Sequence, residues 1–376
     1  MCPVKAASIY IHIPFCVRKC LYCDFASQAG RQSDFGRYCD AVKAEARSAY
    51  ERYGKRDIPS VFIGGGTPTV VPAELLCSLL EEVFRLFPPG EGAEITTEAN
   101  PGTVTLEQLR LLRAAGVNRI SFGAQSFDSA LLRTLGRIHT PSDITKAIET
   151  AREAGFENIN LDLMYALPGQ TQDTWLKTLR EAISLDIPHI SCYSLILEEG
   201  TKLTERVLKG EISVPDDDTC LAMQKTAAQV LSRAGHERYE ISNYAKPGME
   251  CRHNLRYWEG GDYLGLGCAA HSLMDNVRYR NDASIDGYLT GNTYLEAQEL
   301  STSDRLEEAA MLGTRMIRGI ELAAFYDRFG IDFFKAYRTE TLIANKLAVI
   351  SDGFFRLTDA GLDVQDAAVL EMIRDL

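Results

Sequence analysis

Strand-like and helix-like segments alternate regularly over about 200 residues of this chain, and this alternation constrains its fold more strongly than any other feature. Short apolar segments predict strands at residues 8–13, 60–63, 94–98, 119–122, 158–164 and 189–194. Amphipathic segments between them predict helices, several of which end at an Ala-Gly pair. Strands that alternate with helices pair in parallel through right-handed crossovers, which makes the chain an α/β protein. An open sheet and an incomplete TIM-like barrel both satisfy this pattern.

Unusual residues gather at the carboxyl ends of the predicted strands. A cysteine-rich segment follows the first strand, and three consecutive glycines at 64–66 follow the second. Glu98, Gln125 and Asp162 stand at or just after the ends of later strands. In TIM-like barrels the loops that follow the strands build a site on one face. The sequence therefore favours a partial (β/α)6 TIM-like barrel.

Three regions are expected along the chain. Residues 1–200 form the barrel, and residues 201–300, where the alternation stops and aromatic residues and glycines become frequent, form an α+β extension. Residues 301–376 form a small helical domain, in which the segment 354–358 predicts a strand like the wing of a winged-helix domain. The length of 376 residues exceeds the usual size of a single core, in agreement with this division.

Composition narrows the class of protein. The net charge of −12 and the isoelectric point near 5.1 argue against a nucleic-acid binder, because such proteins replace phosphate counterions with basic side chains. No segment is apolar for long enough to span a bilayer, and the first strand follows Met1 almost directly, so we expect no export signal and a cytoplasmic protein. Seven of the ten cysteines are scattered singly, which favours reduced thiols over a disulfide framework.

The remaining three cysteines form one motif, Cys16-x3-Cys20-x2-Cys23. Three thiolates in one short loop can hold three irons of a [4Fe-4S] cluster and leave the fourth iron open. S-adenosylmethionine (SAM) can chelate such an iron, and an electron from the cluster can then cleave its sulfonium to give a radical. Three thiolates could instead hold zinc together with a distant histidine such as His12. The spacing favours the cluster.

At these residues the chain resembles the radical SAM superfamily, in which an aromatic residue, here Tyr22, precedes the third cysteine. From about residue 8 to the C-terminal region, further motifs resemble the family of oxygen-independent coproporphyrinogen III oxidases. These motifs are YxHIPFC at 10–16, GGGTP at 64–68, ExNP at 98–101, GxQSF at 123–127, LGRxH at 135–139, DLM at 162–164 and LPGQ at 167–170.

Two features separate the chain from the decarboxylating oxidases and resemble the HemW branch of haem chaperones. The oxidases carry a further cysteine two residues after the third cluster ligand, whereas Phe25 stands at that position here. Residues 253–258, with the sequence HNLRYW, match the HNxxYW motif of HemW-type proteins. These proteins bind haem and pass it to acceptor haemoproteins.

The resemblance implies a set of SAM-binding residues that supply hydroxyl, carboxylate, amide and guanidinium groups and glycine backbone. The implied SAM-binding residues are Tyr10, Tyr22, Gly65, Gly66, Thr67, Glu98, Gln125, Arg137 and Asp162. The same resemblance assigns Cys16, Cys20 and Cys23 to the cluster.

For haem, the expected contact is His253, because an imidazole can ligate haem iron axially. Tyr257 and Trp258 would offer flat apolar surface to the porphyrin, or they would only pack the extension onto the barrel. Cys251, two residues before His253, is an alternative thiolate ligand.

The function expected from the resemblance is that of a haem chaperone, a protein of porphyrin metabolism that uses a [4Fe-4S] cluster and SAM. The alternative is an oxygen-independent coproporphyrinogen III oxidase or another tetrapyrrole-modifying radical SAM enzyme. Coproporphyrinogen dehydrogenase activity is not expected, because Phe25 replaces the cysteine. Expected partners are haem, acceptor haemoproteins and an electron donor for the cluster, but no nucleic acid. Peripheral membrane association and a homodimer stay open.

Overall fold

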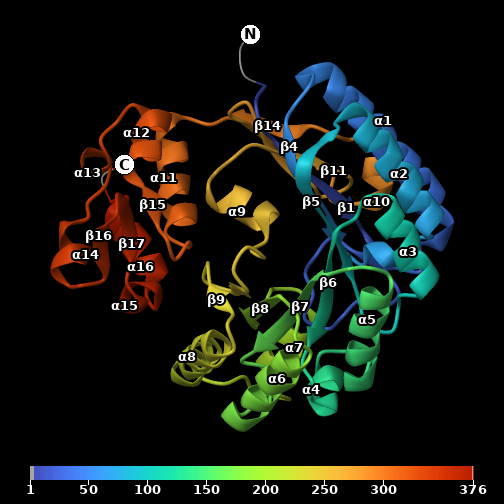
Figure 1. The fold of residues 1–376 in the computed structure, drawn as a ribbon, viewed down its shortest axis with the longest axis horizontal. Coiled ribbons are helices and arrows are strands. Elements are labelled where there is room, and N and C mark those ends of the chain that lie inside the picture. The colour runs from blue at the N-terminus through green and yellow to red at the C-terminus, as the bar shows by residue number, and fades with distance from the viewer. Residues whose placement is uncertain (1–3, 375) are drawn as a thin grey trace.

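Six parallel strands form a curved partial barrel in the computed structural model, which describes residues 4–374 and 376 (Figure 1). Their spatial order is β1-β4-β5-β6-β7-β8, which is also their order along the chain. The strands are β1 (Ser8–Ile13), β4 (Ile58–Gly65), β5 (Pro89–Ala99), β6 (Arg119–Gln125), β7 (Asn158–Tyr165) and β8 (His189–Ser194). The predicted (β/α)6 partial barrel is confirmed.

Helices cover the outer face of this sheet (Figure 1). They are α1 (Phe35–Tyr53), α2 (Ala73–Leu86), α3 (Leu106–Ala114), α4 (Ser129–Thr134), α5 (Pro141–Glu153) and α6 (Gln172–Ser184). Side chains capture the first turn of several of them, as where Thr105 Oγ1 accepts from Gln108 N at the start of α3. The short strands β2 (Phe15–Cys16) and β3 (Gln28–Ala29) pair in parallel within the loop after β1.

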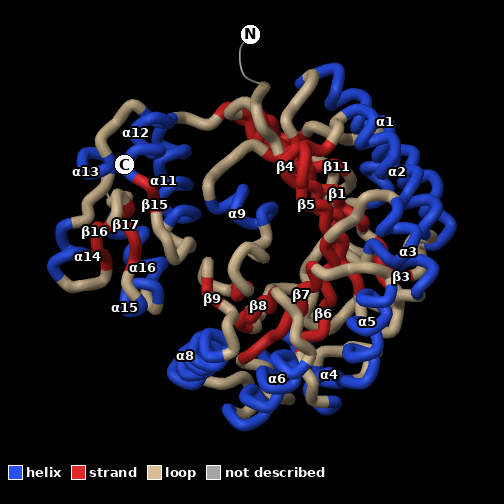
Figure 2. The backbone as a smooth tube through the Cα atoms, viewed as in Figure 1, coloured by secondary structure: helices blue, strands red, loops and turns tan. Residues whose placement is uncertain are grey.

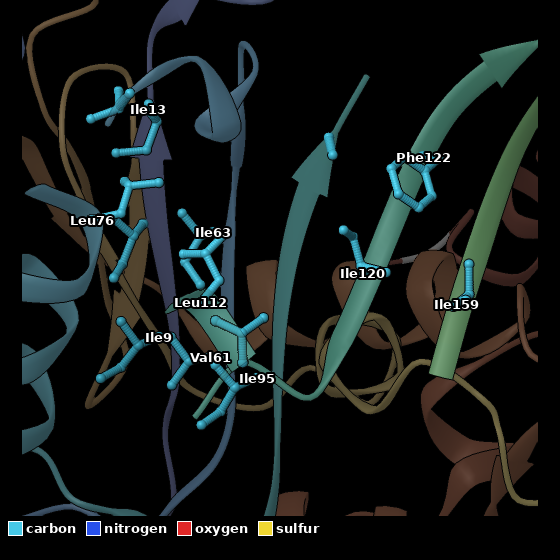
Figure 3. Close-up of a cluster of buried hydrophobic side chains, with 14 of the residues drawn as sticks. Ile9, Ile13, Val61, Ile63, Leu76, Ile95, Leu112, Ile120, Phe122 and Ile159 are labelled. Atoms are coloured by element: carbon cyan, nitrogen blue, oxygen red, sulfur yellow. The ribbon is translucent and has the colours of Figure 1, made fainter. Parts of the chain in front are cut away.

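Side chains alternate strictly along the barrel strands. Apolar residues such as Ile9, Val61 and Ile120 point outward and pack under the helices, where Leu76 of α2 and Leu112 of α3 meet them (Figure 3). The residues between them point into the lumen of the barrel, and most of these are polar. Period-two alternation therefore gives the barrel an apolar outer core and a polar interior.

The region after β8 extends the sheet at both edges. At one edge β11 (Tyr263–Leu266) pairs in parallel with β1, and β12 (His271–Met274), β13 (Val277–Arg280) and β14 (Leu295–Glu299) follow as antiparallel strands. At the other edge β10 (Asn243–Ala245) and β9 (Glu237–Arg238) continue antiparallel from β8. The helices of this region are α7 (Lys202–Leu208), α8 (Asp217–Arg233), α9 (Arg252–Trp258) and α10 (Ile285–Leu289).

Helix α9 lies inside the ring formed by the curved sheet rather than outside it (Figure 2). The Glu94 carboxylate of β5 accepts hydrogen bonds from Arg252 N and His253 N, both at 3.1 Å, and so binds the amino end of the helix to the barrel. His253, Asn254 and Tyr257 of the HNxxYW segment are thereby placed at the barrel lumen.

Residues beyond 301 form a second hydrophobic core of their own. Here a small sheet in the order β15-β17-β16 packs against short helices. The elements are α11 (Thr302–Gly313), β15 (Ile320–Glu321), α12 (Leu322–Phe329), α13 (Phe333–Ala336), α14 (Glu340–Ala344), β16 (Ala348–Ser351), β17 (Phe354–Leu357), α15 (Asp359–Leu362) and α16 (Gln365–Met372). In the part of the chain that the structure describes, no helix has the length and apolar character needed to cross a membrane.

Candidate functional site

The three motif cysteines lie in the loop after β1, and all of them are free and partly buried. Their side chains line one small cavity of about 120 Å³, together with Gly65, Gly66 and residues from the ends of β5, β6 and β7. Burial raises the pKa of the Cys16 thiol, while a hydrogen bond from Thr67 opposes that rise. The loop therefore brings the donors to the carboxyl ends of the strands, where the sequence predicted the site.

The donor set supplies three thiolates from one loop, as a cubane cluster requires. Among residues 4–374 no three histidine, cysteine or acidic side chains converge closely enough to hold a single metal ion. A cubane does not require such convergence, because each thiolate binds a different iron. Arg137 Nη1 lies 3.4 Å from Cys20 Sγ, so the guanidinium borders the three cysteines.

Two glycines keep the wall opposite the cysteines free of side chains. A Cβ on Gly66 would lie 2.5 Å from the Phe15 carbonyl oxygen and 3.0 Å from Cys16 Sγ. Gly65 has φ of +110°, and a Cβ there would meet the His12 imidazole at 2.5 Å. Both positions thus require glycine, and the backbone can approach a ligand directly.

Two carboxylates face the lumen from β5 and β7, the strands on either side of β6. Glu98 accepts a hydrogen bond from Gly65 N at 3.1 Å, and burial together with the nearby charge of Asp162 raises the pKa of Glu98 to about 8. Asp162 accepts from Ser121 Oγ at 3.1 Å and from Asn160 Nδ2 at 2.8 Å. A cationic ligand such as SAM, placed between the two acids, would relieve their repulsion.

Gln125 and Arg137 are held by unusual local geometry. Gln125 has a left-handed φ of +66° beside a register shift in the pairing of β6 with β7, and this bulge turns its side chain into the lumen. The Arg137 Nη2 group donates to Asn100 Oδ1 at 2.6 Å and to the Gly123 carbonyl oxygen. Its guanidinium is thereby fixed beside the cysteine cavity.

Of the remaining expected SAM contacts, Tyr22 and Thr67 line the cysteine cavity, whereas Tyr10 lines a second cavity in the barrel lumen. The Tyr10 hydroxyl shares a hydrogen bond of 3.0 Å with His12 Nδ1, and His12 Nε2 lies 2.9 Å from the Ala26 carbonyl oxygen. Burial raises the pKa of the Tyr22 phenol. Thr67 is buried and accepts from Asn100 Nδ2 at 2.7 Å. The sequence offered His12 as an alternative zinc ligand, but both of its ring nitrogens take part in these hydrogen bonds.

A larger cavity of about 440 Å³ continues from the cysteine loop down the barrel lumen to α9. One wall is aromatic: the Phe62 ring lies 6.2 Å from that of Tyr10 and 5.2 Å from the imidazole of His253, both in stacked orientation. The opposite wall carries polar side chains of β6, β7 and β8. The cavity is therefore amphipathic and large enough for a flat aromatic ligand.

His253 lies at the inner end of this cavity and is 1% exposed. Its Nδ1 shares a hydrogen bond of 3.0 Å with Ser60 Oγ, and its Nε2 shares another of 3.0 Å with the Tyr257 hydroxyl. Burial and the nearby Arg119 lower the pKa of His253 to about 3, so the imidazole is neutral at physiological pH. Axial ligation of a metal by His253 would replace one of the two hydrogen bonds.

The aromatic pair of the HNxxYW segment is divided between two surroundings. Tyr257 lines the lumen cavity, whereas Trp258 lines a different cavity beside the C-terminal region and lies under the guanidinium of Arg315 at 4.4 Å. Cys251 is buried and its thiol lies 3.4 Å from Glu94 Oε1. Neither Trp258 nor Cys251 lines the lumen cavity.

The sequence analysis did not predict several residues that line the lumen cavity. Asn160 connects β6, β7 and β8, since it bonds Ser121 Oγ at 2.7 Å and His189 Nδ1 at 2.6 Å. Arg119 and Ser191 lie in the same polar wall. The available signal was a polar residue at every second position of an otherwise apolar strand.

Comparisons with known proteins agree with this geometry. A family model described as the radical SAM superfamily matches residues 10–182, and one described as the HemN C-terminal domain matches residues 300–364. The solved coproporphyrinogen III oxidase (HemN) of Escherichia coli, described as a radical SAM enzyme, has a TM-score of 0.84 and 22% identity, and covers 98% of this chain and 90% of its own. At that identity the likeness concerns the fold.

Curated relatives are more similar in sequence. A heme chaperone HemW of Escherichia coli (strain K12) is 36% identical and covers 96% of this chain and 96% of its own length. Another, of Bacillus subtilis (strain 168), is 38% identical and covers 86% of this chain and 87% of its own. With this similarity extending over the cysteine loop, the barrel and the C-terminal region, the chain belongs to the HemW family of radical SAM proteins.

Proposed function

We propose that the protein is a haem chaperone, which binds haem in the lumen cavity and passes it to acceptor haemoproteins. The observation that carries the proposal is the continuous similarity to relatives named heme chaperone HemW, over 96% of the chain in the Escherichia coli protein. The aromatic wall formed by Tyr10, Phe62 and His253 supports it, because a porphyrin binds by apolar contact with flat rings.

Cys16, Cys20 and Cys23 would hold a [4Fe-4S] cluster, which when bound supplies an electron and an open iron position for SAM. Gly65 and Gly66 leave backbone exposed to the amino acid portion of SAM, and Glu98 offers a carboxylate to its ammonium group. Arg137 offers its guanidinium to a carboxylate. An electron donor for the cluster is therefore part of the proposal.

The proposed location is the cytoplasm, where thiols stay reduced. In support, none of the nine cysteines that the structure describes forms a disulfide.

For haem we propose His253 as the axial ligand. The neutral imidazole is the form that binds iron, and its low pKa keeps it in that form. His253 Nε2 shares a hydrogen bond with the hydroxyl of Tyr257, which lies on the same helix. Rotation of that hydroxyl away from the imidazole would free Nε2 to bind the haem iron.

A titration of haem into the cluster-loaded protein tests this role. We expect His253→Ala to weaken haem binding by at least about 10-fold and to change the haem absorption spectrum, because an iron–nitrogen bond is lost. His236→Ala is the matched control: His236 is also buried, bonds the Ile187 carbonyl oxygen, and lines neither cavity. An unchanged stoichiometry and spectrum in His253→Ala would remove His253 from the proposal.

Oxidation of coproporphyrinogen III is the competing activity. Phe25, at the position where the decarboxylating oxidases carry a cysteine, is 60% exposed at the mouth of the lumen cavity and offers no thiol. We therefore expect the reconstituted protein to form no protoporphyrinogen in an anaerobic assay with SAM and a reductant. Sustained product formation would overturn the chaperone assignment.

A further inference from the structure

Arg119 places a positive charge in the barrel lumen without a bonded partner. The residue begins β6, is 2% exposed and lines the lumen cavity. Its Nε has no hydrogen-bond partner, and within residues 4–374 its side chain makes neither an ion pair nor a hydrogen bond. An unpaired buried guanidinium is strongly disfavoured unless an anion joins it.

Two carboxylates attract Arg119 electrostatically, but both accept hydrogen bonds from other groups. Glu94 attracts Arg119 electrostatically, but its oxygens accept from Arg252 N, His253 N and the Cys251 thiol. Asp162 lies on the neighbouring strand β7 of the same polar wall, and its oxygens accept from Ser121 Oγ and Asn160 Nδ2. These acids keep the guanidinium charged but leave its donors available to the cavity.

The surroundings of Arg119 indicate what kind of anion fits. The cavity wall formed by Tyr10, Phe62, His253 and Tyr257 is aromatic, and Arg119 faces it from the opposite, polar wall. A flat ring system with a carboxylate at its edge would satisfy both walls. The planar fork of a guanidinium binds a carboxylate through two parallel hydrogen bonds.

We propose that Arg119 anchors a carboxylate of the ligand in the lumen, and that this carboxylate is a propionate of haem. The inference rests on the haem-binding function proposed above and adds the group that orients the porphyrin. SAM also carries a carboxylate. Arg119, however, does not line the small cavity beside the cysteines, and its Cα lies roughly 20 Å along the strand from that of Gln125.

Paired ligands with and without the carboxylate test the proposal on the cluster-loaded full chain. The probes are haem and its dimethyl ester, and SAM and 5′-methylthioadenosine, which lacks the amino acid portion. We expect the wild-type protein to bind haem about 10-fold more tightly than the ester, because a charge-assisted pair is lost in the ester. In Arg119→Gln the affinity for haem should fall to that for the ester, with the affinities for the ester and for SAM unchanged.

Two further variants separate anchoring from stability. Arg119→Lys keeps the charge without the fork and should restore part of the preference for haem. Arg56→Gln is the control, because Arg56 is also buried but pairs with Asp275 at 2.5 Å outside both cavities, and it should change no affinity.

The outcomes are distinct. Equal binding of haem and its ester by the wild-type protein would overturn the propionate contact even if Arg119→Gln fails to fold. Weaker SAM binding in Arg119→Gln, with haem and 5′-methylthioadenosine unaffected, would assign the carboxylate to SAM and overturn the haem contact. No haem binding by the wild-type protein would overturn the proposed function itself, while the SAM comparison would still test Arg119.

Discussion

Gly66 lies closer to the cysteine loop than any residue with a side chain could. The Phe15 carbonyl and Cys16 Sγ occupy the space where its Cβ would stand. Its place beside the cysteines was predictable from the glycine run after a strand, and the same pattern placed Glu98, Gln125 and Asp162 there. In the structure Gln125 ends β6, while Glu98 and Asp162 lie within β5 and β7. Arg119 was not predictable, because it begins a strand and nothing local shows that its side chain lacks a partner.

Replacement of Gly66 by alanine should impair cluster assembly. The added methyl group would displace the Phe15 carbonyl and Cys16, so we expect iron and sulfide content after reconstitution to fall at least about two-fold. Gly36→Ala in α1 is the matched control, because a Cβ there meets no atom within 4 Å. Equal iron content in both variants would show that the close approach of Gly66 is dispensable.

At the scale of elements, the strands followed the predictions closely because period-two alternation and glycine punctuation are local signals. The position of α9 could not be predicted in the same way. Its amphipathic sequence gives no reason to prefer the lumen over the outer face, and its place depends on Glu94, about 160 residues earlier in the chain. A single buried carboxylate thus fixes where the HNxxYW segment lies.

Another carboxylate, Glu45 of α1, joins that helix to the extension and should make stability depend on pH. It accepts from Gly267 N at 2.8 Å, from the Tyr288 hydroxyl at 2.6 Å and from Asn281 Nδ2 at 2.6 Å. Burial nevertheless raises the pKa of Glu45 to about 7, from an ordinary 4.5. Between these two values the folded chain retains a proton that the unfolded chain has released, so this contribution to the unfolding free energy decreases as pH rises.

Denaturant unfolding of the wild-type chain and of Glu45→Gln, between about pH 5 and pH 8, measures this effect. The difference in unfolding free energy between the two proteins should shift in favour of the variant as pH rises towards 7 and then level off. A constant difference over the range would show that Glu45 titrates normally in the folded protein.

At the scale of the whole molecule, the C-terminal region is connected to the barrel through the end of α9. Trp258 lies under Arg315, and Arg315 Nη2 is 3.2 Å from the buried Glu240 carboxylate. The sequence alternative was that both aromatic residues pack the extension onto the barrel, but Trp258 packs against the C-terminal region instead, and Tyr257 lines the lumen. A sequence cannot divide adjacent aromatic residues in this way, because the division depends on which surfaces meet the two faces of the helix.

Trp258→Ala should therefore lower stability without a direct effect on haem. We expect a loss of about 1–3 kcal/mol in unfolding free energy, from the cation–π contact and apolar burial, together with faster proteolysis near residue 300. Trp258→Phe should recover most of the loss. Weaker haem binding at unchanged stability would instead place Trp258 against the porphyrin.

The barrel strands point their apolar side chains outward and mostly polar side chains into the lumen, and this arrangement affects how the protein can exchange a ligand. Its apolar packing is on the helix-covered exterior, as Ile9, Val61 and Ile120 illustrate, while hydrogen bonds between strands hold the hollow centre in shape (Figure 3). The scaffold does not depend on its contents for its hydrophobic stabilisation. A barrel of this kind can bind and release a ligand in its lumen without unfolding. A carrier needs this property, and a chain that folds only around its ligand lacks it.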